Sequence, residues 1–212
     1  PERKSRLISK EEKSIVAYHE AGHAVVMNAI PEADPVQKVS IIARGMAAGY
    51  TIALPVNDQT LMSRKKLMAE MVGLLGGRAA EELVFDDITS GASNDIERVT
   101  QLARNMVTRL GMSSELGPMV YGQKEELIFL GREISEQRDY SESVAEKIDA
   151  EVRSLVNDAY NQAKTLLTSY RAQLEEVAQK LLEVETLSRE EFEKIFPPPV
   201  QHRSGTPIIN NI

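Results

Sequence analysis

Residues 9–31 read SKEEKSIVAYHEAGHAVVMNAIP and predict a helix that ends before Pro31. Ser9 followed by Glu12 fits a capping box, in which each side chain accepts a hydrogen bond from the other residue's backbone N–H. Apolar residues then recur near helical spacing, at Ile15, Val16, Ala24, Val25 and Met27. Small apolar flanks on both sides of its polar centre indicate that the helix is buried.

The centre of this helix carries two histidines four residues apart, with a glutamate directly after the first. Residues i and i+4 share one helix face, so His19 and His23 can bind one ion at about 2.0–2.1 Å from each ring nitrogen. Glu20 is turned about 100° from His19 and can reach a water on that ion. This H-E-x-x-H pattern predicts zinc hydrolysis: the metal activates the water, and the glutamate accepts its proton and passes it to the leaving amine.

The alternative is an ordinary polar patch on a helix. The chain has only three histidines, and two of them lie in this pattern. A buried imidazole pair beside a carboxylate needs a partner such as a metal ion. Ala21 and Gly22 are small and are expected to leave room for an ion and a substrate. We therefore predict one Zn²⁺ per chain.

A catalytic zinc takes three protein ligands and keeps one position open. The remaining histidine, His202, lies in a polar tail after three prolines and is not expected to bind the metal. An extended H-E-x-x-H-x-x-G-x-x-H motif is absent, because Val26 and Ala29 occupy its glycine and last histidine positions. The third ligand is therefore expected to be a carboxylate.

Three acidic residues are candidates for this ligand: Glu81, Glu82 and Asp95. Asp95 lies near the start of a predicted helix, where the macrodipole keeps a carboxylate ionised. The spacing favours Asp95, with Glu82 as the second choice.

The rest of the chain predicts a mainly α fold with a small β-hairpin or sheet: an H-E-x-x-H zinc-protease helical core followed by a C-terminal helical bundle. Strands are expected over 36–45 and 49–55, joined through Gly45 to Gly49. Helices are expected over 60–75, up to a break at Gly76-Gly77, and over 78–85. Further helices are expected over 95–110 with Asn94 as N-cap, over 141–182 with a break near 168–170, and over 188–196 with Ser188 as N-cap. Residues 112–139, which contain ELGPMVYG and LIFLG, are expected to be irregular, with one short strand. The predicted organisation is a zinc metalloprotease core over 1–140, C-terminal helices over 141–196 and a disordered tail over 197–212.

Composition excludes several classes of protein. The chain has 212 residues, a formal charge of −7 and no cysteine, so disulfides and thiolate metal sites are impossible and no nucleic-acid partner is expected. The sequence contains no run of 18 apolar residues, the length that a membrane-spanning helix needs. The opening residues, PERKSRLIS, suggest a piece of a longer protein.

Several stretches in order carry a family resemblance: PERKSRLIS with AYHEAGHAVV, MSRKKLMAEMVGLLGGRAAEELVF, and TSGASNDIERVTQLARNMVTRLGMSSELGPMVYG. Together, over about residues 1–196, they resemble the proteolytic domain of the FtsH family of membrane-anchored, ATP-dependent AAA+ zinc metalloproteases. The resemblance implies a zinc metalloendopeptidase with His19, His23 and Asp95 as metal ligands and Glu20 as the base. We expect Glu82 to orient a ligand imidazole.

The resemblance also implies a strand at the edge of the substrate cleft. We assign Gly49, Tyr50 and Thr51 as its substrate contacts, made through main-chain pairing with an extended peptide. The alternative is a structural hairpin with no role in substrate binding.

For the longer parent, the resemblance implies an AAA+ ATPase module, a homo-hexamer and unfolded membrane or damaged soluble proteins as substrates. The parent would use ATP, whereas this chain has no G-x-x-x-x-G-K-[ST] and is not expected to bind it. The domain would lie on the cytoplasmic side of a bacterial inner membrane, or in an organelle matrix or stroma. The apolar helices after residue 141 could pack between subunits or within one chain. The competing hypothesis is a non-catalytic helical interaction module.

Overall fold

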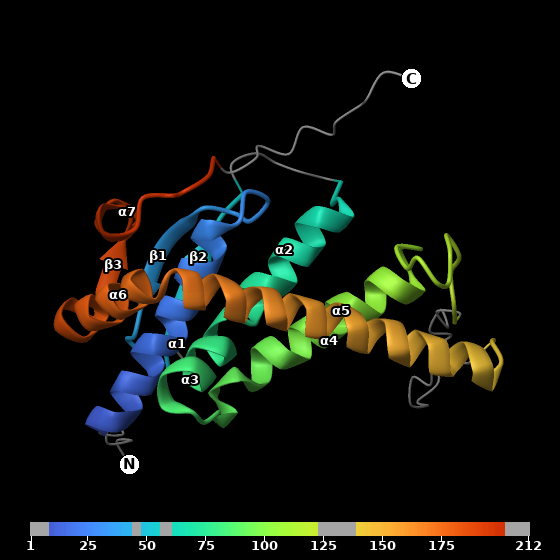
Figure 1. The fold of residues 1–212 in the computed structure, drawn as a ribbon, viewed down its shortest axis with the longest axis horizontal. Coiled ribbons are helices and arrows are strands. Elements are labelled where there is room, and N and C mark those ends of the chain that lie inside the picture. The colour runs from blue at the N-terminus through green and yellow to red at the C-terminus, as the bar shows by residue number, and fades with distance from the viewer. Residues whose placement is uncertain (1–8, 44–47, 56–60, 123–138, 202–212) are drawn as a thin grey trace, which may run out of the picture.

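The computed structural model describes residues 9–43, 48–55, 61–122 and 139–201 and is mainly helical, with a small sheet, which confirms the predicted fold class. Its elements are α1 (Lys10–Ala29), β1 (Val36–Ser40), β2 (Tyr50–Ala53), α2 (Arg64–Leu74), α3 (Gly76–Phe85), the 3-10 turn η1 (Ser90–Ala92), α4 (Ser93–Thr108), α5 (Glu142–Ser169), α6 (Arg171–Val184), β3 (Thr186–Ser188) and α7 (Arg189–Ile195). Figure 1 shows the sheet and α7 at one end of the molecule and the start of α5 at the other.

Helix α1 is the central element. It begins with the predicted capping box between Ser9 and Glu12. It packs against α2, α3, α5, α6 and the first two strands of the sheet. Every residue from Ala17 to Val26 is buried. The polar group in the middle of this helix therefore lies inside the protein.

Helices α1 and α3 approach each other where both lack side chains. A Cβ added at Gly22 would lie 2.5 Å from the carbonyl oxygen of Gly76 and 2.6 Å from Cβ of Ala80. A Cβ added at Gly76 would lie 2.7 Å from the carbonyl oxygen of Gly22. The space expected beside Gly22 for an ion and a substrate is therefore filled by α3, and that prediction was wrong.

The sheet has the order β2-β1-β3, with both pairs antiparallel. Val39 lies opposite Thr51 on one side and opposite Leu187 on the other. The predicted pairing of the first two strands is confirmed, although Gly45 lies outside the described residues. Strand β3 was not predicted. Within the described part of the chain, β2 pairs with β1 alone and forms one edge of the sheet.

The C-terminal helices pack on the same core. Helix α5 lies against α2, α3 and α4, and the predicted break falls at Tyr170, between α5 and α6. Ser188 and Glu191 form a capping box at the start of α7, as its sequence predicts. Most of the apolar stripe is buried within this chain: Ile148, Val152, Leu155, Ala159, Ala163, Leu174, Val177 and Leu181. The stripe is therefore explained without a second subunit.

Other expectations about local structure have mixed outcomes. Helix α4 begins at Ser93 without a side-chain cap, because η1 leads directly into it, so Asn94 is not the N-cap. Residues 112–122 are irregular apart from one bridge between Ser113 and Gly117. No strand is assigned to these described residues; the rest of the segment in which a short strand was expected (123–138) and the tail from His202 lie outside the described residues. None of the helices described here is long and apolar enough to cross a membrane.

Replacement of Gly22 by alanine tests the close approach of α1 and α3. The added methyl group meets backbone atoms that cannot shift alone, so Gly22→Ala should lower the free energy of unfolding by about 1–3 kcal/mol. Gly73→Ala is the matched control: the atoms near its Cβ belong to the flexible Met27 side chain, at 3.0 Å or more. Urea denaturation measures both, and equal stability of the two variants would contradict the account.

Candidate metal centre

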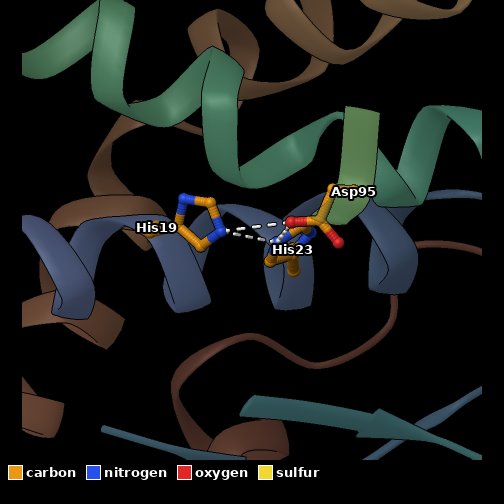
Figure 2. A group of neighbouring side chains, drawn as sticks. All are labelled: His19, His23 and Asp95. Atoms are coloured by element: carbon orange, nitrogen blue, oxygen red, sulfur yellow. Dashed lines mark hydrogen bonds and ion pairs between the residues drawn. The ribbon is translucent and has the colours of Figure 1, made fainter. Parts of the chain in front are cut away.

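Helix α1 directs two imidazole rings at the first turn of α4. Nε2 of His19 and Nε2 of His23 are 3.0 Å apart, and each lies 3.4 Å from Oδ2 of Asp95. Figure 2 shows both rings on α1 and the carboxylate of the neighbouring helix facing them. The structure thus brings together the two histidines and the acidic residue favoured by the sequence, in a group that could hold a metal ion.

Hydrogen bonds on the far side of each ring fix its tautomer. Nδ1 of His23 is 2.8 Å from the carbonyl oxygen of Gly73, which can only accept, so this nitrogen carries the hydrogen. Nδ1 of His19 is 2.7 Å from Oε1 of Glu81 and donates to that carboxylate. When both rings are neutral, as metal ligands must be, their Nε2 atoms are therefore acceptors that point at a third acceptor, Oδ2 of Asp95.

Three acceptor atoms at this separation fit a tetrahedral zinc ion. With zinc–ligand bonds of about 2.0–2.1 Å, two ligands of a tetrahedral site lie about 3.3 Å apart. The observed separations of 3.0 and 3.4 Å are close to this value. Neutral acceptors and a carboxylate do not attract one another, so a positive charge is needed to hold them together: a proton on His19, whose pKa is raised, or a metal ion that replaces this proton.

The electrostatics of the group also favour a cation. Burial disfavours charge on His19, but its contacts with Asp95 and Glu81 and the charge of Glu20 outweigh burial and raise its pKa to about 9. Burial opposes ionisation of Asp95, yet the contacts with His19 and His23 hold the pKa of its carboxyl far below the usual range. A metal ion that binds here must displace a proton from His19.

The backbone of α3 forms the wall next to the two rings. A Cβ added at Gly77 would lie 2.5 Å from Nε2 of His19 and 2.6 Å from Nε2 of His23. Any side chain at position 77 would therefore collide with the Nε2 atoms of the two histidines. The glycine pair that the sequence marks as a helix break allows α3 to approach both α1 and this site.

Glu81 makes the contact that was expected of Glu82. Its side chain is 1% exposed and its second oxygen, Oε2, accepts from the backbone N–H of Thr89 at 2.7 Å. Burial raises the pKa of Glu81, but its bonds with His19 and Thr89 prevail and lower it. Glu81 therefore links His19 to the loop that leads into α4.

Glu82 points away from the histidines. Its carboxylate accepts from the hydroxyl of Tyr160 and lies 2.9 Å from Nζ of Lys164, both on α5. The expectation that Glu82 orients a ligand imidazole is therefore wrong. The two glutamates are neighbours on a helix and are turned about 100° apart, so only one of them can face α1.

The carboxylate of Glu20 lies against strand β2. Oε2 of Glu20 is 2.8 Å from Oγ1 of Thr51, and a Cβ added at Gly49 would lie 2.8 Å from Oε1. The Tyr50 ring faces elsewhere, with Nζ of Lys38 5.8 Å from its centroid. Thr51 and Gly49, assigned from the sequence as substrate contacts, thus lie beside the predicted base.

Comparison with known families decides the affiliation of the chain. The model of peptidase family M41 matches residues 6–195. The chain belongs to this family. This M41 chain is 55% identical over 197 residues to the ATP-dependent zinc metalloprotease FtsH of Thermotoga maritima, an alignment that covers 92% of the chain and 32% of that protein.

Two further relatives carry the same description. An ATP-dependent zinc metalloprotease FtsH 1 from Sphaerobacter thermophilus is 52% identical over 210 residues, which are 98% of the chain and 32% of the relative. The FtsH of Rubrobacter xylanophilus is 54% identical over 195 residues, which are 92% of the chain and 30% of the relative. The M41 chain therefore spans about a third of the length of these relatives. The resemblance to the FtsH family is confirmed.

The contrast between Glu81 and Glu82 gives a matched pair of variants. Glu81→Gln keeps the shape of the side chain but replaces the charged acceptor behind His19, and should weaken zinc binding about 10–100-fold. Glu82→Gln should leave zinc affinity unchanged, because its partners are on α5. Competition with a chromogenic chelator measures both affinities. An equal loss in the two variants, or none in Glu81→Gln, would contradict this assignment.

Proposed function

We propose that this M41 chain is the proteolytic domain of a zinc metalloendopeptidase, cleaving peptide bonds of unfolded polypeptides. The observation that carries the proposal is the convergence of two ring nitrogens and one carboxylate oxygen at 3.0–3.4 Å, with Glu20 next to His19 on the same helix. The FtsH relatives support it, because they are described as zinc metalloproteases.

Each residue of the group has a role in this proposal. His19, His23 and Asp95 would hold the metal through Nε2, Nε2 and Oδ2. Zinc, when bound, polarises the scissile carbonyl and makes water acidic enough to be deprotonated near neutral pH. Glu20 would accept a proton from the attacking water on its carboxylate and deliver it to the amine that leaves. Glu81 holds the ring of His19 in the orientation that directs Nε2 at the site.

Replacement of Glu20 distinguishes a role in zinc binding from a role in peptide cleavage. Glu20→Gln removes the proton acceptor but preserves the size of the side chain, so the zinc-loaded variant should lose casein cleavage while it still binds one zinc per chain. His19→Ala should lose both zinc and cleavage. Zinc content by atomic absorption and release of labelled peptide measure the two properties.

Two results would count against the proposal. Full cleavage by Glu20→Gln would exclude this residue as the base. A wild-type protein that binds no zinc when the metal is supplied would favour the non-catalytic interaction module.

We further propose that an extended peptide adds to the sheet along the edge of β2. Among the described residues this strand pairs only with β1, and the Glu20 carboxylate contacts its inner face. Pairing through main-chain groups gives affinity with little dependence on sequence. Gly49, Tyr50 and Thr51 would take part through their backbone, since the Thr51 hydroxyl is engaged with Glu20.

Substrate peptides methylated at single backbone nitrogens test this pairing. A strand alternates its hydrogen-bonding groups, so methylation at every second residue should raise KM, and methylation between these positions should have little effect. Exchange of side chains at the same positions provides the control. A uniform response to methylation along the peptide would argue against strand addition.

For the longer parent protein we propose membrane anchorage, an AAA+ ATPase module that uses ATP to deliver substrates, and assembly as a homo-hexamer. The domain would lie on the cytoplasmic side of a bacterial inner membrane or in an organelle matrix or stroma. The family resemblance supports this, and the relatives are described as ATP-dependent. Light scattering of the detergent-solubilised full-length protein should give the mass of six chains, and a monomer mass would oppose the assembly.

A further inference from the structure

We propose that Thr51 is a positioning residue that holds the carboxylate of Glu20 in the orientation needed to accept a proton. The inference rests on the proposed function, in which Glu20 is the base. It gives the Thr51 side chain a role separate from the substrate contact proposed for its backbone.

The contact between the two residues is specific. Oγ1 of Thr51 is 2.8 Å from Oε2 of Glu20 and 3.2 Å from the main-chain carbonyl oxygen of the same residue. A carboxylate and a carbonyl can only accept, so the hydroxyl is the donor, and the shorter separation gives its hydrogen to the carboxylate. Glu20 is 6% exposed, so little water is available to replace this donor.

The position of Thr51 in the sheet explains why its hydroxyl points inward. Thr51 pairs with Val39 of β1, and Val39 is fully buried. Side chains alternate along a strand, so positions 49 and 51 share the face turned toward α1. Thr51 is thus anchored on the sheet and contacts the base from an element other than α1.

Gly49 completes this arrangement on the other side of the carboxylate. A Cβ at Gly49 would lie 2.8 Å from both Cγ and Oε1 of Glu20. A side chain at position 49 would collide with Oε1, so the glycine allows the carboxylate to keep this position while the Thr51 hydroxyl engages Oε2. One oxygen is therefore held by a donor, and the glycine beside the other keeps a side chain from that position away from it.

Thr51 acts through Glu20, so its loss should affect turnover and leave metal binding and substrate affinity intact. Thr51→Val removes the hydroxyl but keeps the β-branched shape. In the zinc-loaded protein, kcat for an unstructured fluorogenic peptide should fall about tenfold or more, with KM and zinc content unchanged. Thr51→Ser keeps the hydroxyl and should restore most of the turnover.

Thr168→Val is the matched control. The Thr168 hydroxyl donates to the carbonyl of Lys164 on the exposed face of α5, far along the chain from this site. Its removal should change neither kcat nor KM. Crystal structures of zinc-loaded Thr51→Val and Thr51→Ser give a readout independent of turnover: the Glu20 carboxylate should be rotated in the first and keep its place in the second.

Several outcomes would overturn the inference. Wild-type kcat in Thr51→Val would exclude a positioning role, and a raised KM with normal kcat would show a substrate contact instead. Thr51→Ser no more active than Thr51→Val, or loss of zinc in Thr51→Val, would indicate a role in packing. If Thr51→Val does not fold, Thr51→Ala is judged by the same criteria. Failure of the proposed function is separate, since it would appear as full activity of Glu20→Gln.

Discussion

Where α1 passes α3, the two backbones touch without a side chain between them. Gly22 and Gly76 form this contact, and a methyl group on either would collide with the other's carbonyl. The close approach brings Gly77 next to both imidazole rings and brings Glu81 within hydrogen-bonding distance of His19. The position of the candidate metal site therefore follows from a packing constraint between two helices.

The site built on this contact is electrostatically unbalanced without a cation. Two imidazoles with Nδ1 engaged elsewhere direct their Nε2 atoms at each other and at Asp95. The carboxylates of Glu81 and Glu20 lie close by, and both residues are buried. Buried charges of one sign are costly unless an opposite charge is present; a proton on His19 supplies one, and a divalent ion in its place would supply more.

Four elements contribute side chains to the proposed chemistry. The helix α1 carries the histidines and Glu20, α4 carries Asp95, α3 carries Glu81, and β2 carries Thr51. The sheet has two functions in this arrangement: its inner face contacts the base, and its edge is the proposed path of the substrate. A site assembled from separate elements in this way depends on their packing for its geometry.

Local signals in the sequence predicted much of this structure. The capping box at Ser9, the helical spacing of His19 and His23, and the break at Tyr170 depend on residues close together in the chain, and all three are present. Asp95 was favoured because a carboxylate is stabilised near a helix N-terminus, and it lies in the first turn of α4.

Features that depend on contacts between distant segments were not predictable in the same way. The choice between Glu81 and Glu82 depends on the rotation of α3 about its axis, which its contact with α1 sets. The spacing of Gly77 and Glu81, one helical turn apart, would have favoured Glu81 if the glycine pair had been interpreted as a site of close packing. Strand β3 has three residues and pairs with a strand far away in sequence, so no periodicity indicated it.

A crystal structure of the protein prepared with zinc and without chelator, with anomalous data collected on both sides of the zinc absorption edge, tests the central claim most directly. We expect one anomalous peak per chain, within about 2.0–2.2 Å of Nε2 of His19, Nε2 of His23 and Oδ2 of Asp95. A peak on Glu81 or Glu82 in place of Asp95 would contradict the assigned ligands. Two rings turned apart with no peak between them would contradict the metal site itself.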